Sequence, residues 1–311
     1  MMRLQEFCER LKGERLLRGI SRPELSMPAR PQYRCLLGAV QILLGYLLPP
    51  ALLLSLCTAA LGGDSSQLPG NLRDVLEVMG YIMALGWITK KIRKRKEKNF
   101  FQATNLKPRR FAPRFMLLLV LAGLCFGLAV SALLGLLPLS EGVMDAYESG
   151  TMEHFTGSSA FMGVFIVGIF SPIAEELVFR GFLMGNLREG FSDVFALCLS
   201  ALLFGLMHVQ PVWIVYAACM GLVLGWAALR MENLLASILI HFGFNAAGLL
   251  ILAMPDGSLA ARVTGYPLTL LLCLPAGLLG ALLLTDRVLA EYDRSRAAEA
   301  EPSEENCDGE A

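Results

Sequence analysis

The amino-acid sequence predicts an all-α, polytopic integral membrane protein with about eight transmembrane helices. Apolar residues make up 55% of the 311 residues, and charged residues make up only 17%. The apolar residues fall in blocks long enough to cross a bilayer as helices. Most Lys and Arg residues lie in alternate connections between these blocks, which is the pattern of a chain that crosses the membrane repeatedly.

Eight segments are predicted to span the membrane. They are approximately residues 36–61, 72–89, 115–139, 161–187, 193–208, 211–229, 234–254 and 266–284. Pro49 and Pro50 should kink or break the first span, because proline cannot complete the helical hydrogen-bond pattern. Arg73, Asp74 and Glu77 make the first turn of the second span polar, so its pattern is the least regular of the eight.

The charges predict how the chain is oriented in the cell membrane. With the N-terminus inside, 24 of the 27 Lys and Arg residues fall on the cytoplasmic side, and the exceptions are Arg73, Arg180 and Arg262. Residues 90–114 hold eleven Lys and Arg and one acid, whereas residues 140–159 hold four acids and no base. The positive-inside rule therefore places both termini in the cytoplasm. The basic loop is expected to contact lipid headgroups, not nucleic acid.

The same patterns divide the chain into four parts. Residues 1–35 form a basic cytoplasmic segment, and residues 36–160 form the N-terminal transmembrane helices with the basic loop 90–114. Residues 161–286 form a transmembrane core, and residues 287–311 form an acidic tail that is predicted to be disordered. The eight cysteines are scattered without a C-x-x-C pair, so they are interpreted as small apolar side chains.

Three ionisable residues lie inside the fourth predicted span, at Glu175, Glu176 and Arg180. Such groups are costly in hydrocarbon and are found where they pair, face water or do chemistry. Glu176 and Arg180 are four residues apart on one helix face, with the acid first, which favours an ion pair. Glu175 lies about 100° around the helix from Glu176. Glu175 is therefore the carboxylate left for a function.

Further polar residues lie in two later spans. His208 follows Phe204 by four residues, and Asn245 follows His241 by four residues, so each pair shares one helix face. His154, the third histidine, falls in the acidic connection and is interpreted as a solvated surface residue. Counted from the neighbouring cytoplasmic turns, Glu175, His208 and His241 reach similar depths. We therefore expect them to converge in a chamber open to the cytoplasm.

This set of side chains favours hydrolysis by an activated water molecule. A carboxylate and a neutral imidazole, here Glu175 and His208, can together deprotonate water. An imidazole N–H and an amide on one helix face, here His241 and Asn245, can stabilise a tetrahedral oxyanion. Ser171 and Ser200 have no strong claim as nucleophiles, because intramembrane serines usually serve helix packing.

Taken in order, Glu175-Glu176-x-x-x-Arg180, Phe204-x-x-x-His208 and His241-x-x-x-Asn245 resemble the motifs of the CPBP family, the CAAX proteases and bacteriocin-processing proteins. This family includes the type II CAAX prenyl endopeptidases, and the resemblance covers residues 161–252. It implies an eight-helix, glutamate-type intramembrane endopeptidase that cuts near the C-terminus of its substrate. By motif position, Glu175 would be the general base with His208 as its partner. His241 and Asn245 would form the oxyanion hole, and Glu176 and Arg180 would support the site.

The resemblance leaves cofactor, substrate and even activity open. No cofactor is expected, and zinc ranks second, with His208, His241 and Glu175 as its alternative ligands. The expected partners are membrane lipids and a peptide or protein substrate in or at the membrane, prenylated or bacteriocin-like. The alternatives are a non-catalytic bacteriocin self-immunity or scaffold protein, a zinc-dependent intramembrane metalloprotease, and a transporter that uses the polar groups as a proton relay.

Overall fold

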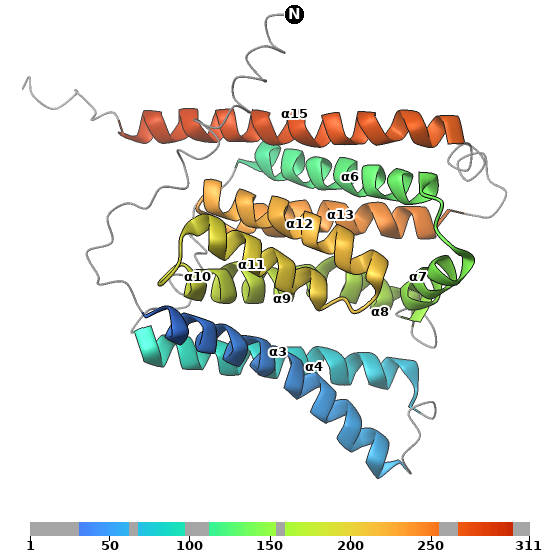
Figure 1. Cartoon of the computed structure of the whole chain (residues 1–311), viewed down its shortest axis with the longest axis vertical. Coiled ribbons are helices and arrows are strands. Elements are labelled where there is room, and N and C mark those ends of the chain that lie inside the picture. Colours follow the sequence, from blue (N-terminus) through green and yellow to red (C-terminus); the bar gives the residue numbers. More distant parts are fainter. Residues whose placement is uncertain (1–30, 62–67, 97–111, 154–158, 255–266, 301–311) are drawn as a thin grey trace, which may run out of the picture.

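The computed structural model describes residues 31–61, 68–96, 112–153, 159–254 and 267–300. These residues form helices that run side by side, and no strand occurs among them (Figure 1). The prediction of an all-α polytopic membrane protein is confirmed. The basic leader up to residue 30, most of the 90–114 loop, His154 and the last part of the acidic tail lie outside the described residues.

The helices follow one another in the order of the predicted spans. They are α3 (Gln32–Ala60), α4 (Gly70–Lys96), α6 (Pro113–Leu136), α7 (Glu141–Glu153), α11 (Asp193–Leu206), α12 (Pro211–Arg230), α13 (Leu234–Leu252) and α15 (Pro267–Ala300). Between α7 and α11 runs one long helical segment, Ala160–Leu187, which we call the Glu175 helix. It consists of α8 (Ala160–Phe165), η2 (Ile166–Phe170), α9 (Ser171–Glu176), η3 (Leu177–Leu183) and α10 (Met184–Leu187).

Six of the described helices are long and apolar enough to cross a membrane. They are α3, α6, the Glu175 helix, α12, α13 and α15. The other two predicted spans are also helical, but α4 is too polar along its length and α11 has only 14 residues. A multi-pass membrane protein is therefore supported, and the number of eight spans stays a prediction.

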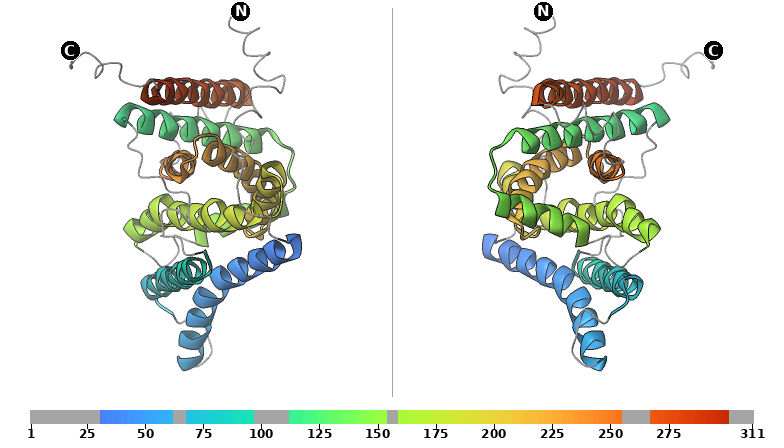
Figure 2. Two further views of the ribbon diagram at one scale, coloured as in Figure 1. Left: turned by 90° about the vertical axis from the view of Figure 1, so that its left-hand side faces the viewer. Right: turned by 90° about the vertical axis from the view of Figure 1, so that its right-hand side faces the viewer.

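The helices are packed in a defined order. α15 lies on α6 and α6 lies on α13, whereas α3 and α4 pack together against the Glu175 helix at the opposite edge (Figure 1). Helices α11 and α12 form a hairpin that lies at mid-height in Figure 1 and along one side of the molecule in Figure 2. The hydrophobic core lies between the Glu175 helix, α12 and α13, and includes Phe179, Leu183, Leu224 and Ile240.

Local sequence explains where several helices begin. Pro113 and Pro211 stand at the first position of α6 and α12, where the missing backbone N–H would have no helical partner. The Ser159 hydroxyl caps α8 by accepting from Met162 N–H, and the Ser192 hydroxyl caps α11 by accepting from Phe195 N–H.

Helix α3 continues through Pro49 and Pro50 and changes direction along its length, so the predicted kink is present and the helix is not broken (Figure 2). Two other predictions differ from the structure. Residues 141–153 of the predicted external loop form helix α7. The predicted disordered tail is helical up to Ala300, because Val288 and Tyr292 are buried and the Tyr292 hydroxyl donates to the Met231 carbonyl at 2.8 Å.

Helices α6 and α13 approach so closely that two glycines are required. A Cβ atom added at Gly123 would meet the Ile240 carbonyl, and one added at Gly243 would meet the Val120 carbonyl. Small residues permit such backbone contact between membrane helices. We expect Gly243→Ala to lower the free energy of unfolding by about 1–3 kcal/mol. Gly248→Ala is the control on the same helix, because its Cβ would meet no atom within 4 Å. Equal thermal stability of the two purified variants would contradict this packing argument.

Candidate active site

Two π-helical turns set the geometry of the Glu175 helix. They cover Ile166–Phe170 and Leu177–Leu183, on either side of the α-helical turn that holds Glu175 and Glu176. A π turn widens the helix by one residue and is often found at functional sites. The π turns are the first local feature of this segment that sequence spacing alone did not predict.

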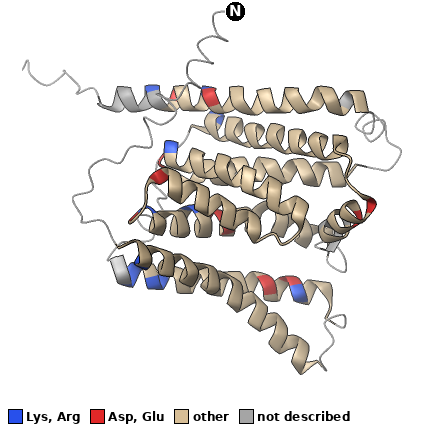
Figure 3. Cartoon of the chain, viewed as in Figure 1, with Lys and Arg blue, Asp and Glu red and all other residues tan. Residues whose placement is uncertain are grey.

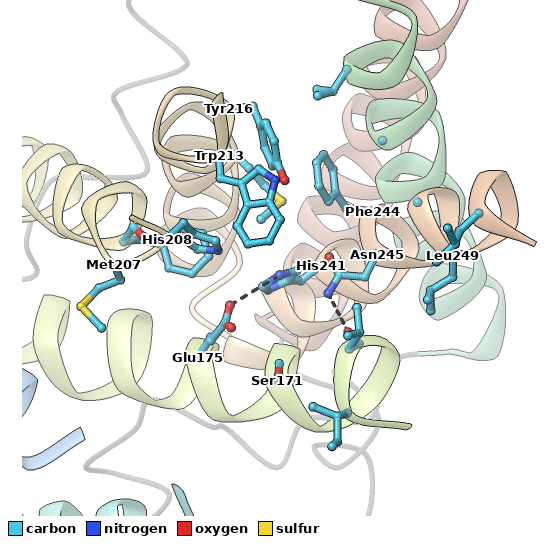
Figure 4. A pocket seen from close by; sticks show the side chains of 18 of the residues that line it. Ser171, Glu175, Met207, His208, Trp213, Tyr216, His241, Phe244, Asn245 and Leu249 are labelled. Carbon is cyan, nitrogen blue, oxygen red and sulfur yellow. Dashed lines mark hydrogen bonds and ion pairs between the residues drawn. The ribbon is translucent and has the colours of Figure 1, made fainter. Parts of the chain in front are cut away.

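The first π turn leaves one backbone carbonyl without a partner in its own helix. The Ser171 N–H bonds to the Ile166 carbonyl, and Pro172 has no N–H, so neither can donate to the Val167 carbonyl. The Asn245 side-chain amide on α13 donates to the Val167 carbonyl instead, at 2.7 Å. Asn245 therefore ties α13 to the π turn beside Glu175 (Figure 4).

The second carboxylate is held in a buried ion pair. Arg180 Nη1 donates to Glu176 Oε1 at 2.6 Å, and the two side chains are at most 1% exposed. Arg180 also donates to the Gly221 carbonyl at 3.2 Å, and its guanidinium lies over the Phe204 ring at 4.3 Å from the centroid. The pair predicted from the four-residue spacing is present, and it ties the Glu175 helix to α11 and α12.

His241 lies between the two carboxylates. Its Nδ1 atom is 3.1 Å from Glu176 Oε1, and its Nε2 atom is 3.8 Å from Glu175 Oε2 (Figure 4). Because the ionised Glu176 carboxylate can only accept, the Nδ1 atom of His241 carries a proton. In neutral His241 the Nε2 atom then presents a lone pair toward Glu175, and it donates a hydrogen bond only when the ring is doubly protonated.

His208 is positioned by the turn between α11 and α12. Its Nδ1 atom lies 2.8 Å from the Phe204 carbonyl, which can only accept, so Nδ1 carries the proton and Nε2 has the lone pair. Val209, the next residue, has a positive φ of 61°, a strained conformation for a β-branched side chain. Backbone strain of this kind collects at functional sites. The turn holds the His208 ring against Phe204 and Trp213.

The candidate residues surround one chamber of about 820 Å³. Glu175, His208, His241 and Asn245 all line it, and Ser171 does as well. Glu176 and Arg180 lie behind its wall. The structure therefore brings together all six residues singled out from the sequence. Their expected catalytic roles are not tested by this arrangement.

The hydrogen bonds differ from those expected for the oxyanion hole. One N–H of the Asn245 amide donates to the Val167 carbonyl, which leaves its second N–H for a substrate oxygen, whereas the proton of neutral His241 points to Glu176. His241 can stabilise a substrate oxygen from the chamber side only as an imidazolium. The spacing of His241 and Asn245 on one face was sufficient to place them together, but not to show where their hydrogen atoms point.

Sequence reasoning missed several residues that line the chamber. Tyr46 and Tyr81 stack with ring centroids 4.9 Å apart, and Glu77 lies one turn before Tyr81 on α4. Trp213 and Tyr216 contribute from α12. The signal in the sequence was Glu77 itself, an acid at four-residue spacing from a tyrosine within a predicted span. It was attributed to a polar helix end.

The chamber lies at the end of the molecule opposite to the one expected. Its lining residues on α6 and α12 are Gly127–Leu134 and Trp213–Met220, far from Arg114 and Arg230 at the basic ends of these helices (Figure 3). Spacing along the helix predicts that Glu175 lies about 20 Å from Arg188. It did not reveal that core residues fill the space between. If the basic end of the molecule is cytoplasmic, the chamber does not open to the cytoplasm.

The alternative zinc set does not fit this arrangement. Within the part of the chain that the structure describes, no three His, Cys, Asp or Glu side chains are grouped closely enough to hold a metal ion. The Glu175 carboxylate lies 3.8 Å from His241 Nε2, whereas the His208 ring packs against Phe204 and Trp213.

The part of the chain that forms the site is similar to a known protein family. Residues 157–247 match the family model described as type II CAAX prenyl endopeptidase Rce1-like. We call these matched residues the Rce1-like region. The Rce1-like region begins just before α8 and ends just after Asn245, so it contains all six candidate residues.

A curated relative gives a weaker match. The chain is 26% identical over 126 residues to UPF0177 protein YxdF of Lactococcus lactis subsp. lactis (strain IL1403). The match covers 40% of this chain and 70% of YxdF. No solved structure matches the chain. At the level of the family, the Rce1-like region supports a CAAX-type intramembrane protease acting on membrane-associated substrates.

Proposed function

We propose that the chain is a glutamate-type intramembrane endopeptidase that hydrolyses a peptide bond near the C-terminus of a membrane-associated substrate. The observation that carries the proposal is the chamber, in which Glu175 faces two imidazoles whose lone pairs are not used by the protein backbone. An apolar wall of Phe179, Phe204 and Phe244 surrounds these groups and strengthens their electrostatic interactions.

In this mechanism Glu175 accepts a proton from water while the water oxygen attacks the carbonyl carbon of the substrate. The His208 Nε2 atom helps to hold the water as a hydrogen-bond acceptor. The tetrahedral intermediate collapses with cleavage of the C–N bond, and protonated Glu175 returns the proton to the leaving amine. His241 enters this step as an imidazolium and faces the oxyanion, and its charge is supported by Glu176.

The experiment compares the C-termini of membrane peptides, by mass spectrometry, in cells that carry the native chain or the Glu175→Ala variant. Peptides cut by the enzyme should appear only with the native chain. Ser171→Ala is the matched control, because Ser171 lines the same chamber and water, not serine, is the nucleophile. A loss of products in Ser171→Ala equal to that in Glu175→Ala would argue for a covalent mechanism instead.

Metal independence is a separate prediction. If Glu175 and His208 activate water unaided, purified protein should keep its activity after dialysis against a strong chelator. The check is metal content per chain measured beside activity, with zinc added back afterwards. Stoichiometric zinc that is lost and restored together with activity would reassign His208, His241 and Glu175 as metal ligands.

A further inference from the structure

Almost all Lys and Arg residues of the described helices lie at one end of the molecule, whereas Asp and Glu residues lie at both ends (Figure 3). Bases mark one end: Lys90, Lys91, Arg93 and Lys94 at the end of α4, Arg114 on α6, Arg188, Arg230, and Arg287 and Arg294 on α15. The opposite end holds α7 with Glu141 and Asp145, and the start of α4 with Asp74, Glu77 and one base, Arg73. The basic end is the one to which 24 of the 27 Lys and Arg residues were assigned by sequence.

The chamber opens toward the acidic end. Its lining residues toward the basic end are fully packed: Phe179, Phe204, Met220 and His241 are at most 2% exposed. Beyond them the core continues with buried residues such as Leu224. Toward the acidic end the lining residues are partly exposed, and they include Trp213 and Met254.

Helix α7 lies beside the chamber at the acidic end. Tyr147 of α7 lines the chamber and packs edge-on against Trp213, with ring centroids 6.4 Å apart. The acidic residues and the open side of the chamber therefore occupy the same end of the molecule. The route from the basic end to Glu175 is about 20 Å of packed helix.

We infer that the chamber opens on the extracytoplasmic face of the membrane and receives peptide segments from that side. Basic residues stay on the cytoplasmic side of membrane proteins, so the basic end is inside and the acidic end is outside. The inference rests on the proposed function for the statement that the peptide is hydrolysed. The substrate class is then an exported or surface-attached peptide, or the outer end of a membrane helix, and not the C-terminus of a cytosolic protein.

The charge of the chamber narrows this class further. Among the described residues that line it are two carboxylates, Glu77 and Glu175, and none is Lys or Arg. A peptide segment with apolar, neutral or basic side chains therefore brings no further negative charge close to Glu175 when it enters the chamber. Acidic segments are disfavoured by the same carboxylates.

The test is thiol labelling with a charged, membrane-impermeant maleimide on intact cells, in full-length protein whose eight cysteines are replaced by alanine. Ser131→Cys places a thiol in the chamber wall, Ser140→Cys places one on the acidic end, and Arg294→Cys places one on the basic end. We expect Ser131→Cys and Ser140→Cys to react in intact cells and Arg294→Cys to react only after lysis. Leu252→Cys, also in the chamber wall, replaces Ser131→Cys if that variant is not recovered folded.

Two results would overturn the inference. If Arg294→Cys reacts in intact cells and Ser140→Cys does not, the orientation is reversed and the chamber faces the cytoplasm. If Ser140→Cys reacts from outside but both chamber thiols react only after lysis, the chamber does not open at the acidic end.

A second measurement separates this inference from the proposed function. Labelling does not require peptide hydrolysis. If the proposed function is wrong, the expected labelling pattern should still be seen, but no sample should contain peptide products. When products do form, external maleimide should stop their appearance in Ser131→Cys cells and leave the cysteine-free parent unaffected. Products that persist in fully labelled Ser131→Cys cells would show that peptides do not enter by this route.

Discussion

Replacing Glu175 by glutamine should abolish peptide hydrolysis while the protein still inserts and folds. Glutamine keeps the size of the side chain but cannot accept a proton from water. Positioned acid–base groups typically contribute about 10²–10⁴-fold to a rate, so at least that loss in turnover is expected. The Glu175 side chain is 20% exposed, and its contact with His241 is long, at 3.8 Å, so neutralising Glu175 should change stability little.

Glu77→Gln is the matched control for this experiment. It removes the other carboxylate of the chamber wall, on α4, while Glu175 and both histidines remain. Turnover is measured for the purified variants in detergent or liposomes, and thermal unfolding is measured on the same samples. The two measurements separate a loss of catalysis from a loss of stability. A folded Glu175→Gln protein that still cleaves peptide, or an equal loss in Glu77→Gln, would contradict the assignment of Glu175 as the base.

Removing either partner of the Glu176–Arg180 pair should destabilise the protein more than any other change considered above. Both side chains are almost completely buried, and each partner holds further contacts, to His241 in one case and to Gly221 and Phe204 in the other. A charge left unpaired in such a place typically costs about 3–5 kcal/mol. Glu176→Ala and Arg180→Ala should therefore chiefly lower abundance and the unfolding temperature.

The exposed pair of Arg114 and Glu291 provides the control for this prediction. Its atoms are 3.5 Å apart, and the Arg114 side chain is 73% exposed, so Arg114→Ala should change stability by about 0–1 kcal/mol. The double variant Glu176→Gln/Arg180→Met should be more stable than either alanine variant, because no charge is then left unpaired. If Glu176→Ala and Arg180→Ala are as stable as the parent and lose only activity, the pair is catalytic and not structural.

The class of fold, and which residues belong to the site, were predicted from the sequence better than the detailed geometry of the site. Four-residue spacing is enough to pair Glu176 with Arg180 and to set His241 and Asn245 on one face, because these relations are local to a helix. Apolar block length is likewise enough to predict six of the spans. Such local arguments succeed because the helix period is nearly fixed.

Relations between helices were beyond such arguments. The bond from Asn245 to Val167 depends on a π turn whose register is set by packing, and Tyr46 reaches the chamber from a helix about 130 residues earlier in the chain. The direction in which the chamber opens depends on which half of each helix packs tightly. Periodicity along one helix does not contain this information. The same limit applies to the tail after residue 287, where composition indicated disorder but α15 buries Val288 and Tyr292.

The short length of α11 has a consequence for the membrane itself. At 1.5 Å per residue its 14 residues extend about 21 Å, well below the roughly 30 Å of a typical hydrocarbon core. A bilayer meets a short helix by thinning around it, at a modest cost per ångström. Thinning beside α11 would bring bulk water close to the His208 turn and supply the second reactant of a hydrolysis. Turnover in liposomes should then fall as the acyl chains of the lipid lengthen. The Arg180–Glu176 ion pair, which is buried inside the protein, should not depend on lipid thickness.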